Sequence, residues 1–239
     1  MELSDVMRTC AAVREFTDEP VSDEQLFSVL DAARFAPSGG NRQGWRVIVV
    51  TDPSLRRSLR ELYLSGWYEY LALAGAGLVP WAPLNDRAAE SDALVGSPSI
   101  AEAAAAGPGG FAEHLDEVPV LALVLADLRA LAAIDRDLDR YTLMGGASIY
   151  PFVWNVLLAA RDAGLGGVLT TVVARRERDV RALLGVPEEF VVAALLALGH
   201  PVHQPKRLRR AQVADFTTRD RFDGPAFGSP TSGAPAAGT

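Results

Sequence analysis

Residues 36–46 form the connection of this chain that is best suited to hold a ligand. They read Ala-Pro-Ser-Gly-Gly-Asn-Arg-Gln-Gly-Trp-Arg. A plain connection between a helix and a strand needs one Gly or Pro, whereas this one has many turn-forming and short polar residues in close order. These residues are Pro37, Ser38, Gly39, Gly40, Asn41 and Gln43. Their backbone N–H groups and short side chains could hold a planar polar ligand, although the first four alone would also suit an ordinary turn.

A helix is predicted directly before this connection. Ser22 and Gln25 have the spacing of a capping box, which starts a helix at Asp23. Apolar residues then recur at the i, i+3, i+4, i+7 spacing of one helix face, namely Leu26, Val29, Leu30 and Ala33. Pro37 prevents the helix from continuing, because a proline inside a helix removes a hydrogen bond and clashes with the preceding turn.

After the connection we expect a strand and a second helix. Residues 45–50 are rich in β-branched side chains, as strands are. Asp52 is a suitable N-cap and Pro53 a suitable first residue for a helix that extends to about residue 63. Residues 64–116 differ in composition, because aromatic residues precede a stretch rich in Ala, Gly and Ser. We interpret this part as a helical lid or insertion.

The rest of the chain predicts more strands and helices. Residues 118–126 and 190–198 are apolar almost throughout, as in strands buried on both faces, and residues 167–173 suit a further strand. Residues 147–163 are apolar nearly all round and end at a glycine, as a buried helix does, and residues 176–184 suit a short helix. The pattern indicates a mixed fold of helices and strands, with a sheet of at least four strands.

Composition indicates one globular domain. The chain has 239 residues, of which 49% are hydrophobic and 22% charged, so it can bury a sizeable core. We place the domain at residues 1–221 and expect residues 222–239, rich in Gly, Pro, Ala and Thr, to be a disordered tail. The net charge of −7 and the lack of a dense basic run before Lys206 argue against a nucleic-acid partner.

Disulfide, metal and membrane functions are not indicated. The single cysteine, Cys10, has no partner for an internal disulfide, and the three histidines lack metal-ligand spacing. The N-terminus has no basic region followed by an apolar stretch, and the longest apolar runs are shorter than the roughly 20 residues that a membrane span needs. We therefore expect a cytoplasmic protein without a metal or a membrane partner.

Four segments of the chain resemble the FMN-dependent nitroreductase family. Residues 8–21 contain the pattern Arg-x-Phe-x-x-x-Pro-Val, and residues 36–45 belong to the connection described above. Residues 146–171 contain Ala-Ser-Ile-Tyr-Pro, an asparagine, Gly-Leu-Gly and a pair of threonines. Residues 198–201 read Leu-Gly-His-Pro and are followed by basic residues. Each pattern is loose by itself, but four in the right order and at the right separations are hard to obtain by chance.

The resemblance covers about residues 5–216 and implies an α+β, nitroreductase-like fold with a mainly antiparallel central sheet flanked by helices. In this family two subunits exchange long helices, so it also implies a domain-swapped homodimer with two FMN sites at the interface. The residues that it assigns to the cofactor are Arg8, Arg14, Pro37, Ser38, Gly39, Asn41, Gln43, Thr170, Thr171 and Arg210. The residues that it leaves for the substrate are Trp67, Tyr68 and Tyr70.

The resemblance gives these residues separate roles. Arg14 and Arg210 match arginines that contact the FMN phosphate, which suits a guanidinium because it can form paired charge-assisted hydrogen bonds. Arg8 could assist them. Thr170 and Thr171 match positions near the isoalloxazine ring, with Thr171 a candidate neighbour of flavin N5. Plainer interpretations are a solvated charge for Arg14, strand positions for the threonines and an insertion core for the aromatic residues.

The chain also departs from the family pattern. An arginine and a serine commonly stand just before the position of Arg14, whereas Cys10, Ala11 and Ala12 stand there in this chain. These changes remove anchors for the phosphate. Gly44 replaces a common proline, which loosens the connection.

The resemblance implies an oxidoreductase that transfers hydride from NADH or NADPH, through FMN, to a nitroaromatic, a quinone or a similar electron-poor acceptor. The flavin carries the chemistry in such an enzyme, so no catalytic side chain is expected. Two alternatives remain open. The chain could be a flavin-dependent dehydrogenase or dehalogenase for a dedicated metabolite, or a catalytically degenerate flavin-binding protein. The choice between FMN and a deazaflavin is open as well.

Overall fold

The computed structural model describes residues 1–228 and divides the chain into two units. The first unit, Met1–Pro205, contains the sheet and helices α1 to α7. The second unit begins at Lys206 and contains the short helix α8 (Val213–Phe216). Residues 229–239, which belong to the expected tail, lie outside the described residues. The domain boundary expected after residue 221 stays a prediction.

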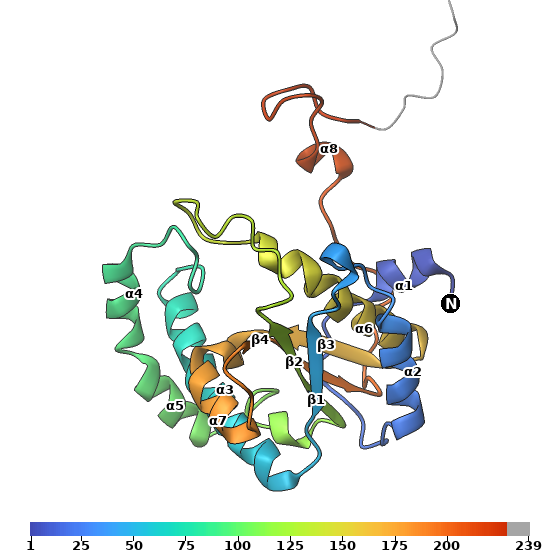
Figure 1. The fold of residues 1–239 in the computed structure, drawn as a ribbon. Coiled ribbons are helices and arrows are strands. Elements are labelled where there is room, and N and C mark those ends of the chain that lie inside the picture. The colour runs from blue at the N-terminus through green and yellow to red at the C-terminus, as the bar shows by residue number, and fades with distance from the viewer. Residues whose placement is uncertain (229–239) are drawn as a thin grey trace, which may run out of the picture. The chain divides into compact units, whose positions relative to one another are not determined.

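A four-stranded antiparallel sheet forms the centre of the first unit (Figure 1). Its strand order is β1-β2-β4-β3, and each neighbouring pair is antiparallel. The strands are β1 (Trp45–Val49), β2 (Val120–Asp127), β3 (Gly166–Thr170) and β4 (Phe190–Gly199). This confirms the antiparallel sheet, but β3 ends at Thr170 because a 3-10 helix follows at Val172–Arg176. Since β3 is an edge strand, one of its sides is free to meet other groups.

Helices cover both faces of this sheet (Figure 1). Helices α2 (Asp23–Ala33) and α6 (Tyr150–Asp162) pack on one face, and helices α3 (Pro53–Gly75) and α7 (Glu177–Leu184) pack on the other. The even-numbered residues of β2 from Val120 to Ala126 belong to the first cluster, and the odd-numbered ones to the second. Because successive side chains of a strand point to opposite faces, this sandwiched strand needs apolar residues throughout.

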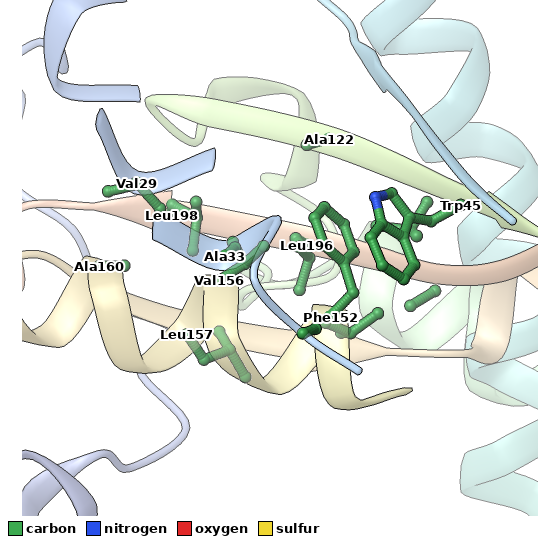
Figure 2. Packing of buried hydrophobic residues seen from close by; sticks show 14 of the residues in the cluster. Val29, Ala33, Trp45, Ala122, Phe152, Val156, Leu157, Ala160, Leu196 and Leu198 are labelled. Atoms are coloured by element: carbon green, nitrogen blue, oxygen red, sulfur yellow. The ribbon is translucent and has the colours of Figure 1, made fainter. Parts of the chain in front are cut away.

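Aromatic and aliphatic side chains fill the space between the sheet and helix α6 (Figure 2). Trp45 of β1 stacks on Phe152 of α6, with ring centroids 4.8 Å apart and planes 6° apart. Leu196 and Leu198 of β4 belong to the same cluster and are almost completely buried. Trp45 comes directly after the polar connection, so its stacking on Phe152 fixes the point where that connection ends.

The starts of the two long N-terminal helices follow their sequence signals. The Gln25 amide N–H donates to Ser22 Oγ (3.2 Å), and the Ser22 amide N–H donates to Gln25 Oε1 (3.0 Å). The capping box at the start of α2 is therefore confirmed. At the start of α3, with Pro53 in its first turn, Asp52 accepts hydrogen bonds from the next two amides.

Helix α3 extends to Gly75, so the expected end near residue 63 is wrong. Its second half packs on the 3-10 helix that follows β3. Gly66 permits this close approach, because a Cβ there would lie 3.0 Å from both a side-chain carbon and the carbonyl oxygen of Val172. The first part of the expected helical insertion therefore continues α3 and is not a separate helix.

The remaining helices of the first unit are short. They are α1 (Leu3–Thr9), α4 (Arg87–Leu94) and α5 (Ser97–Ala105). Helices α4 and α5 both pack beside α3. Within residues 1–228, no helix combines the length and the apolar character that crossing a membrane requires.

Replacement of Leu196 by alanine is expected to lower the free energy of unfolding by about 2–5 kcal/mol, because it removes a buried side chain and leaves a cavity. Urea unfolding followed by circular dichroism measures this change. Leu84→Ala is the matched control, since Leu84 is 97% exposed, and it should change stability by less than about 0.5 kcal/mol. Equal effects of the two substitutions would contradict the place of Leu196 in the core.

Candidate functional site

A hollow of about 470 Å³ lies at the end of β3 and is called the β3 cavity below. Its walls come from the N-terminal segment, helix α3, residues 110–113 and the end of β3. Five residues predicted from the sequence line it, namely Arg14, Trp67, Tyr70, Thr170 and Thr171. The fold therefore brings together residues that lie up to about 150 positions apart in the chain.

The N-terminal segment reaches this cavity because it is attached to the free edge of β3. The amide of Val13 donates to the carbonyl of Gly167 (2.9 Å), and Ala12 forms a parallel bridge with the same residue. A Cβ at Gly166 would lie 2.8 to 3.0 Å from the Val13 side chain, so a glycine is needed for this approach. Arg14 follows directly and is exposed at the cavity.

The free edge of β3 also offers backbone groups to the cavity. Alternate residues of a strand direct their amide groups to the same side. The Gly167 carbonyl faces the N-terminal segment, so the N–H and C=O of Leu169 face that side as well, next to Thr170. Leu169 and Thr170 both line the cavity. This edge can form hydrogen bonds with the polar rim of a planar ligand.

Tyr63 joins helix α3 to this edge. Its hydroxyl lies 3.3 Å from Thr170 Oγ1, and its side chain is almost fully buried. Burial raises the pKa of Tyr63, although the hydrogen bond to Thr170 and the charge of Arg14 act in the opposite direction. The phenol therefore stays neutral near pH 7 and keeps a proton to donate.

Aromatic rings continue along α3 from Tyr63. The ring centroids of Tyr63 and Trp67 are 6.3 Å apart, those of Trp67 and Tyr70 are 5.1 Å apart, and Tyr70 lies 6.1 Å from Trp81. Tyr63, Trp67 and Tyr70 have the i, i+4, i+7 spacing of one helix face. This spacing would have revealed Tyr63 as a site residue if the helix had been predicted beyond residue 63.

Trp81 is held at the far end of this row by an arginine. The guanidinium of Arg175 lies 5.0 Å from the centroid of the Trp81 ring and also pairs with Glu69 of α3 (3.1 Å). Trp81 has φ of +54°, a left-handed conformation that is costly for a bulky residue. The contact with Arg175 offsets part of that strain and fixes the segment between α3 and α4 against the cavity wall.

Tyr68 faces a different hollow from Trp67 and Tyr70. This second hollow, of about 560 Å³, lies between α3 and α5 and is called the α5 hollow below. The Tyr68 hydroxyl donates to Glu113 Oε1 (3.3 Å), and the Gly110 amide donates to Glu113 Oε2 (2.7 Å). Glu113 lines both hollows. No local pattern in the sequence singles out Glu113, because its place depends on the approach of residues 110–113 to α3.

The polar connection at residues 36–46 has a fixed shape. Gly40, Asn41 and Gln43 have φ values of 61°, 52° and 50°, so two non-glycine residues adopt the left-handed conformation. The Gln43 amide donates to Ser38 Oγ (2.9 Å), and the Gly39 amide donates to Ser148 Oγ (3.1 Å). These bonds hold a strained backbone in place, as is typical of binding loops.

Not every predicted site residue meets the β3 cavity. Residues 37–43 are absent from its lining, and Arg8 is exposed on α1. Cys10 is buried beside the Leu157 carbonyl (Sγ to O, 3.7 Å), and burial raises the pKa of its thiol. Arg210 belongs to the second unit, where it donates to the carbonyl of Arg209 (2.7 Å).

Comparison with known proteins agrees with this fold. The family model for the nitroreductase family matches residues 8–200. The chain is 31% identical over 193 residues to an NADH dehydrogenase of Thermus thermophilus, with 81% of this chain and 83% of that protein covered. It is 29% identical over 194 residues to the oxygen-insensitive NADPH nitroreductase of Salmonella typhimurium, with 81% and 63% covered.

A solved structure supports the same fold. The structure of oxidised iodotyrosine deiodinase bound to FMN and 3-iodo-L-tyrosine has a TM-score of 0.60 and 24% identity, and it covers 88% of this chain and 96% of that one. The expected fold, with helices on both sides of an antiparallel sheet, is confirmed by this likeness. Because the family model matches most of the sequence, this chain belongs to the nitroreductase family.

Proposed function

We propose that this chain reduces a nitroaromatic, a quinone or a similar electron-poor acceptor in the β3 cavity, with hydride from NADH or NADPH. The chain is an oxidoreductase that uses FMN, as its family and its relatives indicate. One observation carries the proposal for the site. A single hollow joins a guanidinium, hydroxyl groups, a free strand edge and a row of aromatic rings.

These groups fit the chemistry of FMN. Arg14 is the candidate for its phosphate, as the resemblance implies, and the polar pyrimidine edge of its ring system suits the hydroxyls of Thr170 and Thr171 and the free amides of β3. When bound, FMN supplies the hydride chemistry. The chain itself orients the ring, keeps the Tyr63 phenol protonated and offers aromatic surface that excludes water.

The phosphate of FMN needs further cations. Cys10 and Ala12 cannot provide them, since the first is a buried thiol and the second an alanine. Arg8 and Arg210 remain the cations that the sequence suggests for the phosphate. We include phosphate binding by both residues in the proposal. An arginine is suited to this task because it can bind a phosphate through two parallel hydrogen bonds.

A homodimer is part of the proposed function. Helices α1 and α2 both pack against α6, and all three expose large apolar residues. These include Met7, Phe27, Tyr150 and Trp154, and Phe35 is exposed directly after the end of α2. Residues 37–43 lie outside the β3 cavity of their own chain, so we propose that they reach the cavity of a second copy. A cytoplasmic location also stays a prediction.

A dedicated metabolite is the second candidate for the acceptor. The α5 hollow adjoins the β3 cavity through Glu113, so a specific substituent of a larger substrate could enter it. The structural relative with bound 3-iodo-L-tyrosine is compatible with such a role. Failure of every simple nitroarene and quinone, together with turnover of one halogenated or hydroxylated aromatic metabolite, would favour this candidate.

The purified chain is expected to carry FMN and to oxidise NADH or NADPH when a nitroarene or a quinone is added. Because donor and acceptor use the same cavity in turn, initial rates at several fixed acceptor concentrations should give parallel double-reciprocal lines. The absorbance of NAD(P)H at 340 nm measures the rates. A colourless chain that takes up no FMN would instead support a catalytically degenerate protein.

Arg14→Gln is expected to weaken FMN binding by about 10- to 100-fold, because the charged guanidinium would no longer donate hydrogen bonds to FMN. Quenching of FMN fluorescence measures the dissociation constant. Arg136→Gln is the matched control, since Arg136 is exposed in the loop after β2 and should bind FMN like the original chain. Equal binding by both variants would show that Arg14 does not contact the cofactor.

Co-expression of two defective chains tests whether residues 37–43 act across a dimer interface. One chain carries Arg14→Gln, and the other carries Asn41→Ala with Gln43→Ala. Each homodimer should bind FMN poorly. In a mixed dimer, one site receives both defects and the other neither, so random pairing should restore about a quarter of all sites.

Bound FMN per chain, measured by absorbance, should show about a quarter of the sites restored in the unseparated mixture, and one site of two restored in mixed dimers that are isolated through two different affinity tags. Restoration would support sites shared between two copies. If the mixed dimers bind no more FMN than the homodimers, the loop acts within its own chain or not at all. A monomer in sedimentation analysis would contradict the homodimer directly.

A further inference from the structure

We propose that the β3 cavity selects aromatic acceptors that carry a cationic substituent, such as a protonated amine, and that Glu113 is the residue that recognises the cation. This inference rests on the proposed function, because it takes the β3 cavity as the place where the acceptor binds. Glu113 would be a specificity-determining residue. The acceptor would be an aromatic ring with an ammonium group on a short arm.

Charge in the β3 cavity is limited to two residues. Among the described residues that line it, Arg14 is the one cation and Glu113 the one carboxylate. Both act on the buried hydroxyl of Tyr63, since Arg14 lowers its pKa and Glu113 raises it. The proposed function assigns Arg14 to the cofactor. Glu113 then remains as the charged group available to the acceptor.

Glu113 is held in position and still has binding capacity. The Gly110 amide and the Tyr68 hydroxyl each donate to one of its oxygens. A carboxylate can accept about four hydrogen bonds, so two such donors leave lone pairs free. The fixed orientation favours binding, because little side-chain entropy is lost when a ligand arrives.

No cation within the described part of the chain, residues 1–228, pairs with this carboxylate. Arg60 and His114 line the α5 hollow together with Glu113, but Arg60 pairs with Asp116 (3.0 Å) and His114 with Glu117 (3.3 Å). Within residues 1–228, Glu113 forms no ion pair. A half-buried carboxylate without a cationic partner attracts a cation more strongly than one in open water, because the protein screens charge less than the solvent does.

The aromatic wall beside Glu113 suits the same ligand. Trp67 is stacked between Tyr63 and Tyr70, so this row of rings offers mainly its edges to the cavity, and the edge of an aromatic ring can pack against an acceptor ring. Ring and ammonium group would therefore meet complementary surfaces in one cavity.

The α5 hollow gives the substituent room. On the side of α5 and the following turn, it is lined by small residues, including Ala101, Ala104 and Gly107, while Arg60 and Leu64 line it on the side of α3. A short arm that carries the ammonium group can reach Glu113 from the β3 cavity without displacing a bulky side chain. Glu113 thus stands at the boundary between the place for the ring and the place for its substituent.

Three matched nitroarenes test the proposal with the FMN-loaded enzyme, namely 4-nitrobenzylamine, 4-nitrobenzyl alcohol and 4-nitrobenzoate. At pH 7 they carry a cationic, a neutral and an anionic substituent. In Glu113→Gln, the ratio of kcat/KM for the amine to that for the alcohol should fall about tenfold relative to the original enzyme, mainly through KM. Comparing ratios cancels the different electron demand of the two nitro groups.

Glu102→Gln is the matched control, because it removes the same charge from an exposed position on α5 outside both hollows. Its amine-to-alcohol ratio should equal that of the original enzyme. The ratio of kcat/KM for 4-nitrobenzoate to that for the alcohol should rise in Glu113→Gln, since the repulsion between the two carboxylates is removed. An unchanged amine-to-alcohol ratio in Glu113→Gln, or the same fall in Glu102→Gln, would overturn the proposal.

Binding of benzylamine and benzyl alcohol gives a readout that needs no turnover. Calorimetry on the FMN-loaded chain should show benzylamine bound about tenfold more tightly than the alcohol, and Glu113→Gln should remove this preference. If Glu113→Gln fails to fold, binding of benzylamine and benzyl alcohol is compared between the original chain and Tyr68→Phe. Because Tyr68 orients Glu113, Tyr68→Phe should reduce the preference for benzylamine. Equal affinities for amine and alcohol in the original chain would overturn the inference.

The two levels of the hypothesis can fail separately. If no nitroarene or quinone is reduced while benzylamine still binds through Glu113, the proposed function is wrong and the cation site stands. If all three nitroarenes are reduced with ratios that ignore Glu113, the proposed function stands and the cation site is wrong.

Discussion

The hydrogen bond from the Val13 amide to the Gly167 carbonyl is the contact on which the candidate site depends. It fastens the N-terminal segment to the free edge of β3 and so places Arg14 beside the end of that strand. The approach is possible because Gly166 has no side chain to collide with Val13. If this attachment were lost, the guanidinium would no longer share a cavity with the hydroxyls of Thr170 and Thr171.

Helix α3 couples the core to the site. Leu59 and Tyr63 are buried against the sheet, whereas Trp67 and Tyr70 continue the same helix as a wall of the β3 cavity. A single rigid element therefore carries both packing and recognition. Such sites hold their geometry better than sites on loops, because the side chains are positioned by a helix that the core already fixes.

The same fold separates functions that the sequence places side by side. Trp67 and Tyr68 are neighbours in the chain, yet they face different hollows, because consecutive residues of a helix point about 100° apart. The polar connection at residues 37–43 shows the opposite relation. Its strained backbone is preformed by local bonds, but it lies outside the cavity of its own chain, which is why the proposed site needs a second copy.

Local signals in the sequence determined much of this protein. The capping box at Ser22, the N-cap at Asp52 and the apolar runs of the four strands act over short distances, so they could be predicted and are confirmed. The resemblance to the nitroreductase family is confirmed as well, since it rests on short patterns in a fixed order. Each cap, strand run and family pattern by itself depends on residues that lie close together in the chain.

Only the tertiary structure decided which of these residues meet. Residues 64–75 were expected to be helical, but their continuity with the helix that begins at Pro53 was missed, and it is this long helix that packs on the 3-10 helix after β3. Glu113 was missed because its importance arises from the distant residues that surround it, not from its neighbours in the chain. Sequence patterns report the local conformation of the chain, whereas a binding cavity is made by contacts between segments that are far apart along it.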